Sequence, residues 1–193
     1  FSIRTKKSFG VGDFGDLKLL IDWAAKVGLK LIQVLPLNDT IGTHTDADVL
    51  PYAAITAFAL NPLFLNLPAM GKLPVAHPLQ KAYKQKQAEL NAKELVEFLE
   101  VVNFKLEYAK ELCKNQQDKF LKTKGFKIFF EENKYWLEPY AAFCVLRDLY
   151  GTPDYRQWKE YAVFDAEHLN ILCSPESPHY DAIVTNYFIQ YHL

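Results

Sequence analysis

Apolar residues recur at helical spacing near the start of the chain, over residues 13–27. One face of the predicted helix carries Leu17, Leu20, Ile21, Ala24 and Ala25. Asp13 or Asp16 can cap its first turn, and Gly28 supplies the residue type that commonly ends a helix. The pattern therefore predicts an amphipathic helix with defined ends.

A short apolar run, Lys30–Leu35, follows this helix directly. Its length and its β-rich composition are typical of a buried parallel strand. Pro36 ends the predicted strand, and a long polar loop runs from Leu37 to Tyr52. Because the loops at the carboxyl ends of parallel strands hold the ligand in α/β folds, we expect a binding site in this loop.

From about Pro74 the pattern changes to charged amphipathic helices, and no second strand of comparable strength follows. The clearest is Glu94–Leu121, whose lysines alternate with acidic residues as they do on a solvated helix face. Further helices are predicted over Lys127–Glu132, Leu137–Leu149, Ala166–Leu172 and Tyr180–Leu193. Pro139 suits the first turn of the helix that contains it, and Gly151-Thr-Pro153 closes that helix.

The composition is that of a globular protein, since 50% of the 193 residues are hydrophobic and 23% are charged. A net charge of −1 gives no electrostatic reason to bind nucleic acid or an anionic membrane. No apolar stretch is long enough to span a bilayer and no signal peptide opens the chain, so we expect a cytoplasmic protein. The first residue is Phe1 rather than methionine, so we also expect a segment upstream.

Cysteine and histidine residues indicate neither disulfides nor a metal site. Cys113, Cys144 and Cys173 lie far apart in apolar surroundings, which is typical of reduced, buried thiols in a reducing compartment. The five histidines are equally scattered, without the spacing of metal ligands on a helix.

A glycine-rich segment, Gly10-Val-Gly-Asp-Phe-Gly15, matches the dinucleotide-binding fingerprint and opens a helix. That fingerprint binds a pyrophosphate only where a buried strand runs into the first glycine. Here the polar segment Arg4-Thr-Lys-Lys-Ser8 precedes it. We favour a tight turn into the helix over nucleotide binding, and we expect no cofactor.

Several short segments occur in a fixed order from one end of the chain to the other. They are Phe1-Ser-Ile-Arg4, Gly10-Val-Gly-Asp-Phe14, Gln33-Val-Leu-Pro-Leu-Asn-Asp-Thr40, Pro51-Tyr52 with Ala57-Phe-Ala-Leu-Asn-Pro62, Trp136-Leu-Glu-Pro-Tyr-Ala-Ala-Phe-Cys144, Leu146-Arg-Asp148 and Ile189-Gln-Tyr-His-Leu193. In this order they resemble the amylomaltase (4-α-glucanotransferase) family, and most closely its plant-type disproportionating enzyme branch. Each segment is only a few residues long, and their shared order is hard to produce by chance.

The resemblance implies an α/β fold, a partial (β/α)8 TIM barrel with a mainly helical insertion. Residues 1–70 would form the start of the barrel, namely the end of the first strand, the first helix and the second strand, with the substrate-site loop at residues 37–52. Residues 71–193 would form the insertion that leads to the third barrel strand. Because a closed barrel needs ~250 residues, we expect an amino-terminal part of the catalytic domain, with the rest of that domain as its partner.

Acidic residues in the loop are the first candidates for a site, since glycosidases place their acid and nucleophile at the carboxyl ends of strands. A retaining mechanism needs two carboxyl groups ~5–5.5 Å apart, and Asp46 and Asp48 are too close in sequence to be held at that separation without help. The alternative to a catalytic role is that they are solvated in the loop or form an Asx-turn. In the resembled family an aspartate stands shortly before Pro-Tyr, and Asp48 matches it. Leu50 stands where that family usually has a serine or a tyrosine.

Tyr52 has an aromatic ring that can pack on a pyranose and a hydroxyl that can bind a sugar hydroxyl, although packing in the core is the alternative. By resemblance the substrate-binding residues are Tyr52, Asp48, Pro51 and Asn38, and the substrate is an α-1,4-glucan or maltose.

The resemblance also implies a retaining double displacement by an aspartate nucleophile and a glutamate acid/base. The family motifs that carry both residues are absent from this chain, and Arg4, Arg147 and Arg156 are not followed by x-Asp-His. We therefore expect no catalytic residue here and no activity from the chain alone. The alternative from another class is a non-catalytic helical module that binds a glucan or a protein.

Overall fold

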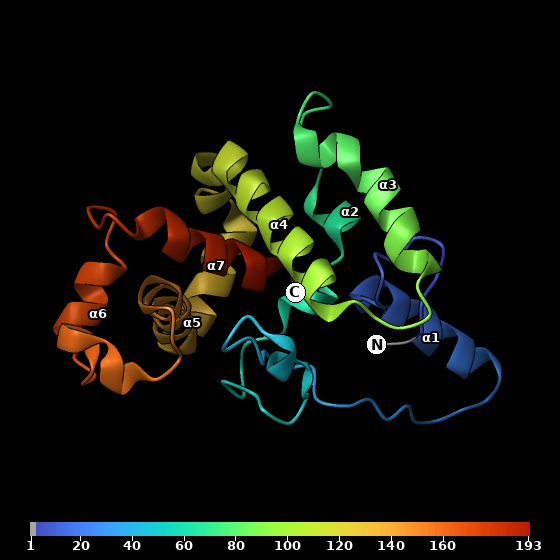
Figure 1. Ribbon diagram of the computed structural model, residues 1–193, viewed down its shortest axis with the longest axis horizontal. Helices are drawn as coiled ribbons and strands as arrows, with labels where there is room; N and C mark the ends of the chain where they lie inside the picture. Colours follow the sequence, from blue (N-terminus) through green and yellow to red (C-terminus); the bar gives the residue numbers. More distant parts are fainter. Residues whose placement is uncertain (1–2) are drawn as a thin grey trace.

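The computed structural model describes residues 3–193, so Phe1 and Ser2 of the first resembling segment lie outside it. The elements are α1 (Phe14–Lys26), η1 (Asp46–Val49), η2 (Pro62–Phe64), α2 (Leu67–Met70), α3 (Pro78–Ala92), α4 (Phe98–Leu121), α5 (Lys124–Tyr150), η3 (Tyr155–Gln157), η4 (Lys159–Tyr161), α6 (Ala166–Leu172) and α7 (Tyr180–His192). Figure 1 shows α1 and α3 at one end of the molecule and α5, α6 and α7 at the other, with α4 between them.

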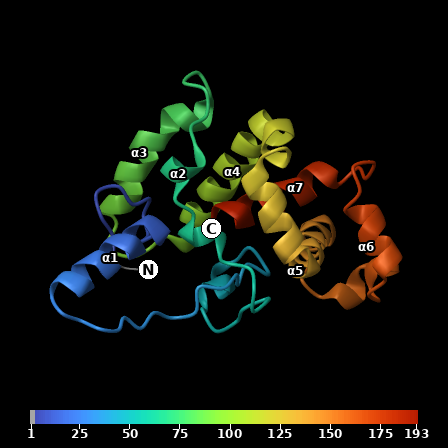
Figure 2. The ribbon, with the colours of Figure 1, turned by 180° about the vertical axis from the view of Figure 1, so that it is seen from behind.

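The predicted partial barrel is wrong, because residues 3–193 contain helices and no strand. The only strand-like pairing in this described part is an isolated antiparallel bridge between Asn38 and Leu60. The segment Lys30–Leu35 is extended, but no segment lies beside it in either view (Figures 1 and 2) and its backbone makes no hydrogen bond to another segment among residues 3–193. Leu31 is 79% exposed, so the apolar run is not buried. A strand exists only with a partner to complete its ladder, and the described chain offers none.

The first helix is confirmed. Asp13 caps α1 through a full capping box with Asp16, in which each side chain accepts from a backbone N–H of the other residue. Gly28 follows the helix with a φ of 83°, a value that glycine adopts without strain. The predicted apolar face is largely open, however, since Ala24 is buried while Ile21 is 51% exposed and Ala25 is also exposed.

The helical core lies where α4, α5 and α7 pack together. Later helices match their predicted ranges closely, but the helices predicted over Lys127–Glu132 and Leu137–Leu149 form one helix, α5. Pro139 therefore lies inside a helix and not in a first turn. Proline removes one N–H donor there, which leaves the carbonyl of Tyr135 without its helical partner. Tyr135 is exposed, so water can take that place.

The charged side chain of Lys105 lies within the core. Lys105 of α4 is buried, and its ammonium donates to the carbonyl oxygens of Leu63 (2.6 Å) and Leu65 (2.8 Å). Burial lowers the pKa of Lys105 to about 8, although the carboxylates of Asp13 and Asp16 act in the opposite direction. Lys105 thus joins α4 to the segment that follows the candidate loop.

Contacts of α4 with η2 and α2 cross the predicted boundary at residue 70, and that boundary stays a prediction. In the part of the chain that the structure describes, no helix has both the length and the apolar character needed to cross a membrane.

Candidate functional site

The loop after the extended segment is closed at its base by backbone hydrogen bonds. Asn38 pairs with Leu60 in the isolated bridge, and the Asp39 N–H donates to the Ala59 carbonyl at 2.9 Å. The Ile55 N–H donates to the Asp39 carbonyl at 2.8 Å. Residues 38–61, which we call the site loop, therefore have a fixed base although they form no sheet.

Asp39 is the buried acid of this base, with 1% of its surface exposed. One carboxylate oxygen accepts from the N–H of Ile41 (3.0 Å), and the other accepts from the hydroxyl of Tyr140 on α5 (2.7 Å). Burial raises the pKa of Asp39 to about 6, while these two hydrogen bonds and the nearby charge of Arg147 act to lower it.

Arg147, also on α5, holds the next part of the site loop. Its buried guanidinium donates to the carbonyl of Ile41 and, at 2.7 Å, to the carboxylate of Asp148. The same carboxylate oxygen is 2.9 Å from the Nε2 atom of His44, in a partly exposed hydrogen bond. Beside the bond between Asp39 and Tyr140, the loop is therefore joined to α5 at two further places, one buried and one near the surface.

Gln190 of α7 holds the other end of the site loop. Its side-chain oxygen accepts from the Leu60 N–H and its amide nitrogen donates to the Leu60 carbonyl, both at 2.9 Å. Its amide nitrogen also lies 3.5 Å from the Tyr140 hydroxyl oxygen. One side chain from each of α5 and α7 thus meets at the base.

Two of the predicted substrate-binding residues come together in the structure. Asn38 and Pro51 line a pocket of about 210 Å³, together with Thr40, Asn61 and several apolar residues. The amide of Asn61 donates to Thr40 Oγ1 at 3.1 Å, so the polar wall of this pocket is itself hydrogen-bonded.

Asp48 is buried beside the loop backbone instead of facing that pocket. Both carboxylate oxygens accept from the N–H of Thr43, at 3.0 and 3.1 Å, and one also accepts from the Thr43 hydroxyl. Thr40 Oγ1 donates to the Asp48 carbonyl at 2.5 Å. The Asp48 side chain therefore stabilises the loop, while Asp46 is exposed on the same short helix η1.

Tyr52 lies at the surface, with 77% exposure, and does not line the pocket of Asn38 and Pro51. Its ring is free to meet a ligand that approaches from solvent. The structure thus brings Asn38 and Pro51 together, links Asp48 to them through Thr40, and presents Tyr52 apart from them.

The hydrogen bonds that hold this loop in place were not predicted from the sequence. These bonds are made by Asp39, Tyr140, Arg147 and Gln190. A signal was present, because all four fall within the short segments that carry the family resemblance. Those segments are far apart in sequence, yet their side chains meet at the base of the loop.

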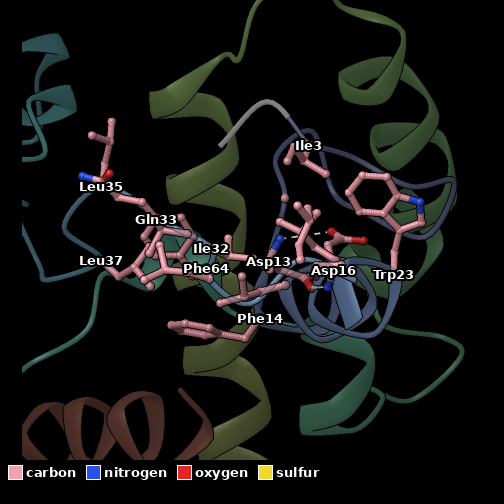
Figure 3. A pocket seen from close by; sticks show the side chains of 17 residues that line it. Ile3, Asp13, Phe14, Asp16, Trp23, Ile32, Gln33, Leu35, Leu37 and Phe64 are labelled. Carbon is pink, nitrogen blue, oxygen red and sulfur yellow. Dashed lines mark hydrogen bonds between the residues drawn. The ribbon is translucent and has the colours of Figure 1, made fainter. Parts of the chain in front are cut away.

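A larger pocket of about 460 Å³ lies between α1 and the extended segment. Figure 3 shows Trp23 and Asp16 of α1 on one side and Ile32 and Leu37 on the other. Its walls are mostly apolar, and we call it the α1 groove.

The turn at Gly10, which precedes α1, supports the turn interpretation of the glycine-rich segment. Gly10 has a φ of 74°, and a Cβ there would lie 2.8 Å from side-chain atoms of Leu90 and Val101. Glycine is therefore required by the close approach of α3 and α4. The preceding residues form turns and no strand, so the arrangement of a dinucleotide site is not present within residues 3–193.

Comparison with known proteins identifies relatives over the whole chain. The family described as 4-alpha-glucanotransferase matches residues 1–193. The chain is 41% identical over 193 residues to 4-alpha-glucanotransferase DPE2 of Oryza sativa subsp. japonica, covering 100% of this chain and 20% of the rice protein. It is 37% identical over 158 residues to the 4-alpha-glucanotransferase of Chlamydia pneumoniae, covering 79% of this chain and 28% of that protein. The chain therefore spans less than a third of the length of each of these relatives.

Proposed function

This chain belongs to the 4-alpha-glucanotransferase family, and from that premise we propose that it supplies a sugar-binding loop to an enzyme that transfers α-1,4-linked glucosyl units. Donors and acceptors would be maltose, maltooligosaccharides and larger glucans. The observation that carries the proposal is the exposed ring of Tyr52 on a loop whose base is fixed by buried hydrogen bonds. A preorganised aromatic ring suits a pyranose, which offers an apolar face and hydroxyls around its edge.

The acids of the site loop support a binding role over a catalytic one. The Asp48 carboxylate is engaged by Thr43, and the Asp39 carboxylate by Ile41 and Tyr140. A nucleophile must reach the anomeric carbon, and neither buried carboxylate faces solvent. We therefore propose that both carboxylates of a retaining mechanism lie elsewhere in a longer polypeptide, and that no cofactor takes part.

The test is a transfer assay on the longest polypeptide that the encoding gene specifies, beside the 193-residue chain alone. With maltotriose as substrate, the long polypeptide should produce both shorter and longer maltooligosaccharides, and the 193-residue chain should produce none. The all-helical structure favours a second candidate, a non-catalytic glucan-binding module. Sugar binding by the long polypeptide without any transfer would select that candidate.

In the active long polypeptide, Tyr52→Ala should lower kcat/KM for maltotriose more than Tyr52→Phe. The ring supplies packing area, whereas the hydroxyl supplies one hydrogen bond worth ~0.5–1.5 kcal/mol, so the Phe variant should lose no more than about tenfold. We expect kcat to fall more than KM rises, because the contact serves the reacting sugar. Initial rates and the melting temperature of each variant measure this. Unchanged kinetics in a folded Ala variant would remove Tyr52 from the site.

We propose further that another part of the long polypeptide covers the α1 groove, since relatives extend well beyond the matched region. In its absence the exposed side chains of Leu31 and Val34 should drive self-association. The 193-residue chain should then be oligomeric by light scattering, and Leu31→Lys should shift it toward the monomer. Val75→Lys is the matched control, because Val75 is also exposed but lies outside the groove. A monodisperse monomer of the unsubstituted chain would contradict this proposal.

A further inference from the structure

The site loop takes its shape from α5 and α7, although its candidate substrate-binding residues all lie in residues 38–52. We infer that Tyr140 is a positioning residue for Tyr52, acting through the buried carboxylate of Asp39. The inference rests on the proposed function, because Tyr52 matters only if its ring contacts the substrate. It assigns a role to a side chain of α5 that never meets the sugar itself.

Asp39 links both halves of the site loop. Its carboxylate accepts a hydrogen bond from the Ile41 N–H in the first half of the loop. Its backbone N–H and carbonyl bond to Ala59 and Ile55 in the second half, where the chain runs back to the base. The hydroxyl of Tyr140 is the contact that joins this acid to the helical core. A displacement of Asp39 therefore moves both halves together.

Tyr52 lies between two contacts that depend on this base. Before it, the Asp48 carbonyl accepts from Thr40, which directly follows Asp39. After it, the Ile55 N–H donates to the Asp39 carbonyl. The position of the exposed Tyr52 ring is thus set through Asp39 on both sides.

Tyr140 is well placed to hold Asp39 because its own position is fixed. Its side chain is buried, it packs with Ala59 and Cys144, and its ring centroid is 6.4 Å from that of Trp136. Removing the hydroxyl would leave a buried carboxylate with one donor fewer, which is costly. The least costly response is a shift of Asp39, and with it of the loop.

The test is a double-mutant cycle in the active long polypeptide, combining Tyr140→Phe with Tyr52→Ala. Tyr140→Phe alone should lower kcat/KM for maltotriose about tenfold, the size expected for a hydrogen bond to a charged group. In the Tyr52→Ala background the same change should have little further effect, because the residue it positions is gone. Tyr83→Phe is the matched control, since the Tyr83 hydroxyl is buried without a hydrogen-bond partner in the described structure.

Hydrogen exchange of residues 39–56 gives a readout that does not need activity. We expect these amides to exchange about tenfold faster in Tyr140→Phe than in Tyr83→Phe, with α4 unchanged. If Tyr140→Phe does not fold, Gln190→Met is the second variant, because it frees the Leu60 end of the same base. Loss of all transfer in the unsubstituted polypeptide would refute the proposed function, while the exchange data would still test the base. Additive effects in the cycle, or unchanged exchange of the loop, would overturn the inference.

Discussion

Replacing Lys105 by methionine should lower the free energy of unfolding by about 2–4 kcal/mol at pH 7. Methionine fills a similar volume, but the buried carbonyls of Leu63 and Leu65 lose their donor, at ~1–3 kcal/mol each. Part of that loss is offset, because the variant no longer buries an ammonium group. At about 2–4 °C per kcal/mol, the melting temperature should fall by several degrees.

The pH dependence separates this explanation from a simple packing defect. The pKa of Lys105 is lowered from 10.5 to about 8 in the folded state, so the unfolded chain binds more protons between these two values. The stability contributed by Lys105 therefore rises as the pH increases from 8 to 10.5. Urea unfolding at several pH values should show the wild-type advantage over Lys105→Met growing across this window. Lys110→Met, on an exposed position of the same helix, should change little, and a stable Lys105→Met protein would show that the two carbonyls need no donor.

Replacing Asp39 by asparagine should stabilise the protein at neutral pH. The rise of the Asp39 pKa from 3.8 to about 6 corresponds to a cost of about 3 kcal/mol when the buried carboxylate is charged. Asparagine keeps the shape and can still accept from the Ile41 N–H, while its amide can donate to the Tyr140 oxygen. It thus resembles the protonated acid at every pH.

The sign of the pH dependence follows from that raised pKa. The folded state binds the Asp39 proton more tightly than the unfolded state does. The contribution of Asp39 to the free energy of unfolding of the wild-type protein is therefore fully present below pH 3.8, and it is lost as the pH rises through 6. The advantage of Asp39→Asn should be near zero at pH 4 and close to its full size at pH 7. Thermal unfolding of both proteins across this range measures it, with Asp46→Asn as the exposed control. A variant that is less stable at pH 7 would mean that the charge itself holds the base together.

The helices with predicted ranges could be predicted because their signals are local, whereas no range is predicted for α2 or α3. Asp13 and Gly28 mark the ends of α1 within a few residues of sequence, and Gly151 ends α5 in the same way. The division of α5 failed because Pro139 has a strong local preference that the surrounding packing overrides. The strand at Lys30–Leu35 failed for the opposite reason, since a strand depends on a neighbour that no local pattern supplies.

The candidate site was predictable only in part. The resemblance placed Asn38 and Pro51 near a ligand, and the structure puts both in one pocket, while the binding role of all four candidates remains a prediction. The bond between Asp39 and Tyr140 spans 101 residues of sequence, so periodicity and spacing carry no trace of it. Asp39 has a structural role because it is buried, and its burial cannot be seen from the sequence because it arises only in the folded chain.

The hydrogen bonds at the base of the site loop join residues far apart in sequence, and this determines when the loop can fold during protein synthesis. The bonds between Leu60 and Gln190 join residues 130 positions apart, so they cannot form until α7 has left the ribosome. The hydrogen bond between Asp39 and Tyr140 likewise cannot form until α5 has been synthesised. In contrast, α1 and α3 can form from local contacts as they emerge. The site loop, although it is translated early, is therefore among the last parts of this region to reach its final conformation.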